Sequence, residues 1–199
     1  MRCASRLALM VLSLAGAWGC GGAPIAPGKA PAAEALFYVS KGYVTAYLGG
    51  PDNFSGAPLA PLASALSFAA VYDCPVDGVI DYACDTGGSS AQTDAFNMTF
   101  KRCRYDNRYT ISGGVHYAVS RDPTAPTLAA MAMRGAVTFD GEIADAIEFD
   151  ATQTVDLTAL WVRSGTVTVT LDGFIEDSSG RYDFASEAIS IPARGIDHE

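Results

Sequence analysis

Apolar and polar residues alternate one by one along most of the chain after Val79, and this alternation restricts the fold more than any other feature of the sequence. The segment AFNMTFK, for example, places Phe96, Met98 and Phe100 on one side of an extended chain and polar residues on the other. Because successive side chains of a strand point to opposite faces of a sheet, the pattern predicts strands with one buried face, as is typical of antiparallel sheets. The other apolar positions in this phase are Tyr109, Ile111, Val115, Tyr117, Val119, Met131, Met133, Val137, Phe139, Ile147, Phe149, Val155, Val167, Val169 and Leu171.

Short connections rich in turn residues separate these segments, namely DTGGSS, RDPTAP, FDGE, LDG and EDSSGR. They predict a meander of about seven strands, in which each strand pairs with the next one along the chain. The last segment changes phase between Phe184 and Ile189, so we expect a β-bulge within 185–187. Four glycines at irregular spacing are interpreted as residues that begin strands: Gly78, Gly114, Gly135 and Gly165.

The buried face of such a sheet needs a cover, and the segments before the strands are the candidates. AAEALFYVSKGYVTAYLGGP places Leu36, Val39, Tyr43 and Tyr47 at helical spacing and ends in a helix stop at 49–51. APLAPLASALSFAAVY, residues 57–72, also permits a helix. The predicted fold class is therefore mainly β: an antiparallel meander, curved or half-barrel, packed against one or two N-terminal helices. Closure of the sheet into a small barrel is the alternative.

The N-terminal segment has the features of an export signal. Arg2 and Arg6 precede the apolar run Leu7–Ala17, which is too short to cross a bilayer core of about 30 Å as a helix. Small residues then lead to Cys20. The segment resembles a bacterial lipoprotein signal peptide, with Ala17-Trp18-Gly19-Cys20 as the lipobox.

This resemblance implies that Cys20 receives a diacylglyceryl thioether and becomes the first residue of the mature chain. Two or three acyl chains would attach the protein stably to a membrane, and Gly21 after the cysteine favours the outer membrane as the destination. The alternative is ordinary secretion, with cleavage after Ala17 or Gly19 and a secreted or periplasmic product. The predicted organisation is a signal peptide over 1–19, a flexible Gly-, Pro- and Ala-rich tether over 20–34, and one β-rich domain over 35–199.

The charge of the chain argues against nucleic acid as a partner. The sequence has 13 basic and 22 acidic residues, and loss of Arg2 and Arg6 with the leader would lower its net charge from −9 to −11. Phosphate contacts require clustered Lys and Arg, and an acidic surface is not attracted to an anionic membrane. Contact with a membrane is therefore expected through the N-terminal lipid alone.

The cysteines after the tether, Cys74, Cys84 and Cys103, predict one disulfide and one thiol. A hairpin of 78–84 with 96–103 aligns its apolar positions if Ile80 faces Phe100, Tyr82 faces Met98 and Cys84 faces Phe96. In this register Cys103 points to the opposite face, near Asp77, and cannot reach Cys84 within the ~7 Å that a bridge between Cα atoms requires. We therefore predict a Cys74–Cys103 disulfide and a buried Cys84 thiol.

The sequence contains no catalytic or metal-binding pattern that we interpret as functional. His116 falls on the solvent-facing side of a strand, and no Gly-x-Ser-x-Gly motif is present. The acidic residues Asp140, Glu142, Asp145, Glu148 and Asp150 lack the spacing of a calcium loop and alternate with apolar residues as a solvated strand face does. We expect no catalytic residue, no metal and no cofactor.

The expected function is that of a non-catalytic envelope lipoprotein whose tethered β-domain binds or scaffolds a partner. The alternative is a carrier that holds a hydrophobic ligand in a cavity between sheet and helices; the outline resembles the half-barrel carriers of envelope lipoproteins at the level of fold. The apolar residues expected to face such a ligand are Phe96, Met98, Phe100, Tyr117 and Met133. An extracytoplasmic hydrolase is a third hypothesis, disfavoured by the small number of candidate bases.

Overall fold

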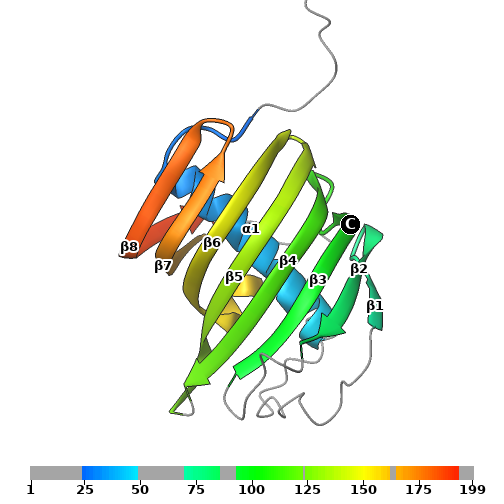
Figure 1. Cartoon of the computed structure of the whole chain (residues 1–199), viewed down its shortest axis with the longest axis horizontal. Coiled ribbons are helices and arrows are strands. Elements are labelled where there is room, and N and C mark those ends of the chain that lie inside the picture. Colours follow the sequence, from blue (N-terminus) through cyan, green and yellow to red (C-terminus); the bar gives the residue numbers. More distant parts are fainter. Residues whose placement is uncertain (1–23, 49–69, 86–92, 123, 162–164, 193–199) are drawn as a thin grey trace, which may run out of the picture.

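The computed structural model describes residues 24–48, 70–85, 93–122, 124–161 and 165–192, which form one curved sheet and one long helix (Figure 1). Eight antiparallel strands follow each other in the sheet in chain order. The elements are α1 (Lys29–Leu48), β1 (Ala70–Asp73), β2 (Asp77–Cys84), β3 (Thr93–Arg104), β4 (Tyr109–Asp122), β5 (Ala125–Gly141), β6 (Asp145–Asp156), a 3₁₀ helix (Leu157–Trp161), β7 (Thr166–Asp177) and β8 (Gly180–Pro192). The predicted mainly-β meander is confirmed.

The sheet is open, because β1 and β8 lie at its two edges and do not pair with each other. Closure into a small barrel is therefore excluded. The sheet has one strand more than the predicted seven. This additional strand is β1, which belongs to the segment that we expected to be helical. Val71 and Tyr72 pair with Asp81 and Ile80 of β2, so the available edge of the sheet outweighs the weak helical pattern of this stretch. The rest of the predicted second helix lies outside the described residues.

The helix α1 runs diagonally across the concave face of the sheet, with its N-terminal end near β7 and β8 (Figure 1). Lys29 pairs with Glu187 of β8, and Tyr43 stacks on Phe96 of β3 at 5.7 Å between ring centroids. Tyr117 on β4 donates a buried hydrogen bond of 3.0 Å to the carbonyl oxygen of Val39. Within the described residues, α1 is the long helix that covers the concave face.

The alternation predicted from the sequence corresponds to the two faces of the sheet. Burial in β6 switches residue by residue, and its inward residues Ile147, Phe149 and Val155 are each 1% exposed. Aromatic rings on neighbouring strands stack directly: Phe96 lies 4.9 Å from Tyr82 and 5.2 Å from Tyr117. This aromatic layer forms the centre of the core.

The predicted β2–β3 register is confirmed, with Ile80 opposite Phe100, and so is the disulfide between Cys74 and Cys103, whose Cα atoms lie 5.5 Å apart. The orientation predicted for Cys103 is wrong, however. A bulge between Phe100 and Cys103, with Arg102 at φ 54°, turns Cys103 back into the core, where it is fully buried.

The free thiol of Cys84 is half-buried, so the expected full burial is also wrong. Cys84 is the last residue of β2, and the end of a strand is covered less completely than its middle. The bulge predicted in the last strand is confirmed: two residues of β8 lie between Phe184 and Glu187, whereas a single residue of β7 lies between their partners, and Ser186 adopts φ 51°.

Two of the four glycines interpreted as strand-entry residues have that position, since Gly78 and Gly165 lie at the starts of β2 and β7. Gly114 and Gly135 lie in the middle of strands instead, so that interpretation was wrong for them. The backbone bends near them: neighbouring Gly113 has φ 136°, and a Cβ there would lie 2.4 Å from the carbonyl oxygen of Ala136. Only glycine fits such a kink, which lets the sheet curve around α1.

The packed domain begins about ten residues earlier than the predicted start at residue 35. Ile25 is 3% exposed, and α1 begins at Lys29 within the predicted tether 20–34. The reason is a set of hydrogen bonds that composition does not reveal. The backbone N–H of Ile25 donates to Asp145 at 2.9 Å, and that of Gly28 donates to the Tyr182 hydroxyl at 3.0 Å.

Two features bear on localisation. The Cys74–Cys103 disulfide is typical of a domain in an oxidising, extracytoplasmic compartment. No helix within the described residues combines the length and the apolar character needed to cross a membrane.

Candidate functional site

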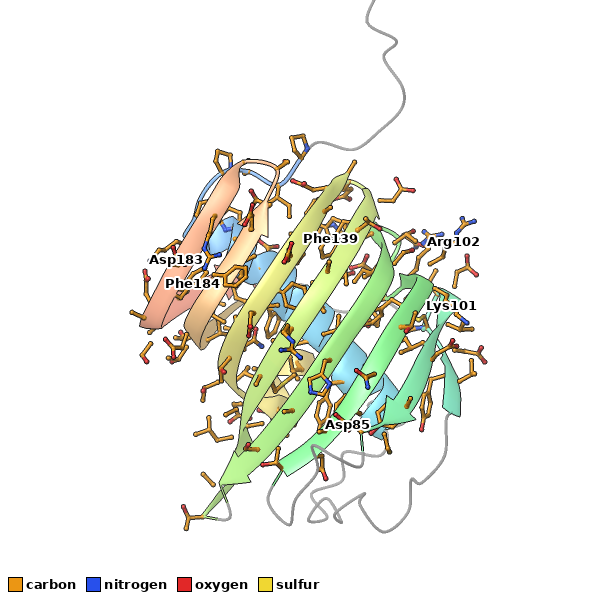
Figure 2. All side chains as sticks on the ribbon, in the orientation of Figure 1. Asp85, Lys101, Arg102, Phe139, Asp183 and Phe184 are labelled. Carbon is orange, nitrogen blue, oxygen red and sulfur yellow. A yellow bond between two sulfur atoms is a disulfide. The ribbon has the colours of Figure 1, made fainter. Side chains whose placement is uncertain are left out.

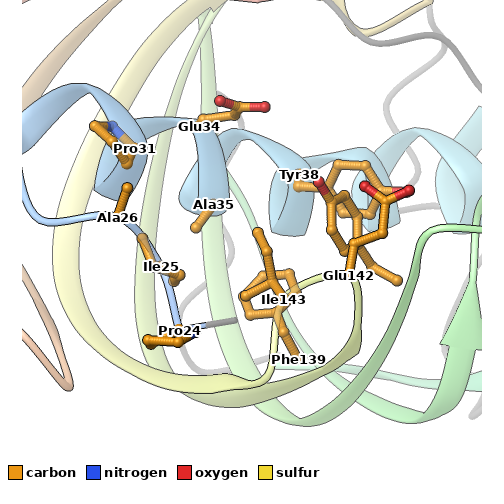
Figure 3. Close-up of a pocket in the computed structure, with 11 residues that line it drawn as sticks. Pro24, Ile25, Ala26, Pro31, Glu34, Ala35, Tyr38, Phe139, Glu142 and Ile143 are labelled. Atoms are coloured by element: carbon orange, nitrogen blue, oxygen red, sulfur yellow. The ribbon is translucent and has the colours of Figure 1, made fainter. Parts of the chain in front are cut away.

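A cavity of about 270 Å³ lies between the N-terminal half of α1 and the turn that joins β5 to β6 (Figure 3). Phe139 forms part of its wall near the end of β5 (Figures 2 and 3). The complete lining is Pro24, Ile25, Ala26, Pro31, Glu34, Ala35, Tyr38, Tyr109, Phe139, Glu142 and Ile143. The walls are thus mostly apolar and aromatic, with two carboxylates among them, which is the composition of a small-ligand site.

The segment Pro24–Gly28, which we call the strap, closes one side of this cavity. Besides the two bonds made by Ile25 and Gly28, the carbonyl oxygen of Ile25 accepts a hydrogen bond from Ser179 at 3.4 Å. Partial burial acts to raise the pKa of Asp145, but hydrogen bonds from Ile25, Ser178 and Ala146 outweigh it and lower that pKa. Asp145 is therefore a charged acceptor that fixes the direction in which the chain enters the domain.

On the side opposite the strap, an arginine joins the two turns beside the cavity. Arg108 follows β3 and donates from Nε to Glu142, which follows β5, at 2.8 Å. Its guanidinium also donates to the Tyr109 hydroxyl at 2.9 Å and lies over the Tyr109 ring. Burial acts to lower the pKa of Arg108, but the hydrogen bond to Glu142 and the charges of Tyr109, Glu142 and Asp106 together outweigh it and raise that pKa. The pair fixes the distance between the two turns.

Tyr38 and Tyr109 line the cavity, and Tyr38 also contacts Tyr105 and the buried Asp106, which lie outside the lining. The Tyr38 ring meets Tyr109 edge-on at 4.9 Å and Tyr105 at 5.6 Å. Asp106 is 1% exposed and accepts a hydrogen bond from the Arg108 backbone N–H at 2.8 Å. Burial first, and the Asp106 carboxylate second, raise the pKa of Tyr38. The Tyr38 hydroxyl nevertheless has no hydrogen bond of ordinary geometry with any described residue.

Glu34 and Lys41 lie on the same helix as Tyr38. Burial raises the pKa of the Glu34 carboxyl, an effect that the positive charges of Arg108 and Lys41 oppose. Lys41 is 2% exposed, and its ammonium lies over the ring of Tyr38 at 5.1 Å. The cavity therefore has a half-buried carboxylate on the helix and a buried cation behind its aromatic wall.

The lining is suited to binding a small ligand. Its charged groups are the carboxylates of Glu34 and Glu142, and Arg108, which does not line the cavity, is paired with Glu142. In the part of the chain that the structure describes, no cluster of three or more His, Cys, Asp or Glu side chains could hold a metal ion.

The apolar residues predicted to face a ligand lie elsewhere. Their exposed fractions are 0% to 1%, and none of them lines the cavity; they are Phe96, Met98, Phe100, Tyr117 and Met133. They pack into the core under α1, which occupies the space that the carrier hypothesis assigned to a ligand. Cys20 lies outside the described residues.

The polar candidates lie on the outer side of the sheet or in its turns. The Nδ1 atom of His116 lies 3.2 Å from Oδ1 of Asn97, on the face turned away from α1. Glu148 and Asp150 are exposed in β6, as expected for a solvated strand face. Of the five acidic residues considered as calcium ligands, only Glu142 lines the cavity, while Asp145 holds the strap.

Sequence reasoning missed Glu34, Tyr38 and Arg108 as residues of a site. One signal was present: Glu34, Tyr38 and Lys41 have the spacing i, i+4, i+7 and therefore share one helix face. Glu34 and Lys41 are two of the three charged residues on a largely apolar helix, which indicates a polar contact. No local signal places Arg108 or Glu142 beside that face.

Comparison with known proteins gave no relative: no protein-family model, no curated protein and no solved structure matches this chain.

Proposed function

We propose that this protein is a non-catalytic envelope lipoprotein, attached to a membrane through Cys20, whose β-domain binds a small ligand in the cavity beside the strap. The disulfide supports an extracytoplasmic location, and the N-terminal segment supports the lipid anchor by its resemblance to a lipoprotein signal peptide. The outer membrane is the destination that Gly21 favours.

The observation that carries the proposal is the way in which α1 covers the concave face. Because the inward aromatic residues pack against α1 and against each other, space for a ligand is found at the end of the sheet. A carrier of long acyl chains would need α1 to leave the sheet. At about 270 Å³, the cavity is slightly smaller than the roughly 300–1,000 Å³ of pockets for drug-sized ligands, and therefore suits a small molecule.

The strap relates the proposed anchor to the cavity. Cys20 precedes Pro24 by four residues, which span at most about 14 Å when extended. The strap is held to Asp145 and Tyr182, so the chain would leave the domain at the cavity and bring this end close to the membrane surface. A site at this end would meet ligands at or near that surface.

The anchor is tested by expressing the full chain in a bacterial host and measuring the intact mass of the membrane-extracted protein. We expect the mass of a mature chain that begins at an acylated Cys20, and we expect Cys20→Ser to leave the membrane fraction. Cys84→Ser is the matched control and should remain in the membrane. An unmodified Cys20 in the wild-type protein would overturn the anchor.

The binding function is separated from the carrier alternative by the lipid that co-purifies. We expect less than stoichiometric lipid, apart from the covalent acyl chains, after gentle detergent extraction. One tightly held lipid per chain would instead favour the carrier and contradict the proposal.

A further inference from the structure

We infer that the cavity beside the strap takes a small primary ammonium ion with a short apolar arm. This inference rests on the proposed binding function and names the chemical class of the ligand. It follows from the polar atoms of the cavity, its aromatic walls and the balance of its charges.

The charged groups that line the cavity are the carboxylates of Glu34 and Glu142, which accept hydrogen bonds only, when ionised. Tyr38 contributes its ring to the lining, whereas its hydroxyl is inaccessible from the cavity and lies under the influence of the Asp106 carboxylate. A primary ammonium group carries three N–H donors and can therefore donate to both carboxylates.

The aromatic walls are suited to a cation as well. Tyr38, Tyr109 and Phe139 line the cavity, and both Tyr38 and Phe139 meet the Tyr109 ring nearly at right angles, at 89° and 85°. This protein already places cations on two of these rings, because Arg108 lies 5.0 Å from the centroid of Tyr109 and Lys41 lies 5.1 Å from that of Tyr38. Ring faces attract positive charge, so the walls stabilise an ammonium ion and its apolar arm together.

The charges around the cavity leave room for one more cation. The charged groups that act on its tyrosines and on Glu34 are Glu34, Asp106, Glu142, Lys41 and Arg108. Three of these are carboxylates and two are cations, so their formal net charge is −1. A monovalent cation neutralises the cluster, whereas an anionic ligand would add to the repulsion.

The test uses the full chain, extracted from membranes in a neutral detergent and titrated by calorimetry with three probes of similar size. We expect propylammonium to bind at least tenfold more tightly than 1-propanol, which has the same propyl arm without a charge, or propionate, which has an ethyl arm and a negative charge. Equal binding of the three probes would overturn the inference.

Two variants place the binding at the cavity. We expect Glu34→Gln, which keeps the shape of the side chain, to weaken propylammonium binding at least tenfold, while Glu148→Gln on the outer face of β6 leaves it unchanged. Wild-type affinity in Glu34→Gln would overturn the inference.

The same ammonium group could come from a free amine or from a lipid headgroup, and two competition experiments distinguish these sources. Vesicles of phosphatidylethanolamine in phosphatidylcholine should compete with propylammonium if the natural source is a lipid. If the source is a soluble amine, free ethanolamine should compete and the vesicles should not. If propionate or 1-propanol binds more tightly than propylammonium, the ammonium inference fails while the proposed binding function stands. Loss of the Cys20 anchor would affect only the proposed location.

Discussion

The centre of the concave face and the end of the sheet beside the strap are both built from aromatic residues, yet one is solid and the other is hollow. At the centre, Phe96, Tyr82 and Tyr117 stack in nearly parallel layers beneath α1. At the end, Tyr38 and Phe139 meet Tyr109 edge-on around a cavity of about 270 Å³.

The difference follows from the groups between the rings. The central rings are surrounded by apolar side chains, which can approach until their surfaces touch. Between the rings at the end lie Glu34, Asp106 and the Arg108–Glu142 pair, whose hydrogen bonds fix the two turns at a set distance. The hollow end thus has contacts determined by hydrogen-bond geometry, and the solid centre has contacts determined by close packing.

The largest effect should come from removing a central ring. Phe96→Ala should lower the free energy of unfolding by about 3–5 kcal/mol, because the ring is fully buried between two others and its loss leaves a cavity. Phe139→Ala, at the end, should cost about half as much, since its ring already borders empty space. Urea denaturation of both variants measures the two values, and equal values would contradict the contrast between centre and end.

The disulfide should matter most at the hollow end, because Cys103 immediately precedes the turn that carries Tyr105, Asp106 and Arg108. The double variant Cys74→Ser, Cys103→Ser should lose about 3 kcal/mol of stability, as expected for a closed loop of this length. Cys84→Ser is the control and should change little. Hydrogen exchange should accelerate more at amides 105–109 than in the middle of β5 and β6, and a uniform acceleration would show that the disulfide does not act locally.

Gly42 tests how closely α1 approaches the centre. Alanine at this position would normally favour a helix by about 1 kcal/mol, but its Cβ would lie 2.6 Å from the Phe100 ring and 2.7 Å from the Tyr105 hydroxyl. We therefore expect Gly42→Ala to destabilise the protein by about 1–3 kcal/mol. Thermal unfolding monitored by circular dichroism measures this, and a stabilised variant would mean that the helix is free to move away from the sheet.

The smallest effect on stability should be that of Glu34→Gln at the hollow end, and it should depend on pH. Because burial raises the pKa of Glu34 in the folded protein, its ionisation opposes folding as the pH rises above its ordinary pKa of 4.5. The variant lacks this cost, so its melting temperature should equal or slightly exceed that of the wild type at pH 7. The difference should disappear below pH 4.5, and a variant markedly less stable at pH 7 would contradict the assigned cause of the shift.

Much of the sheet could be predicted because it depends on local pattern. The alternation of Phe96, Met98 and Phe100 determined which residues of β2 lie opposite them. This register located the disulfide and showed that Cys84 could not take part in it. The bulge at Ser186 followed from a change of phase within one strand. The bulge at Arg102 escaped prediction because the change of phase at Cys103 was interpreted as a side chain on the opposite face of the sheet.

The sequence by itself determined the meander, its buried face and its disulfide, because each of these rests on residues whose spacing along the chain is also their spacing in the sheet. Only the tertiary structure decided where the cavity lies. Glu34, Tyr109 and Glu142 come from a helix, the start of β4 and the turn after β5, and the strap reaches Asp145 across 120 positions of sequence. Such a site is created when a curved sheet brings distant segments to the same end of a helix, and no local pattern encodes that meeting.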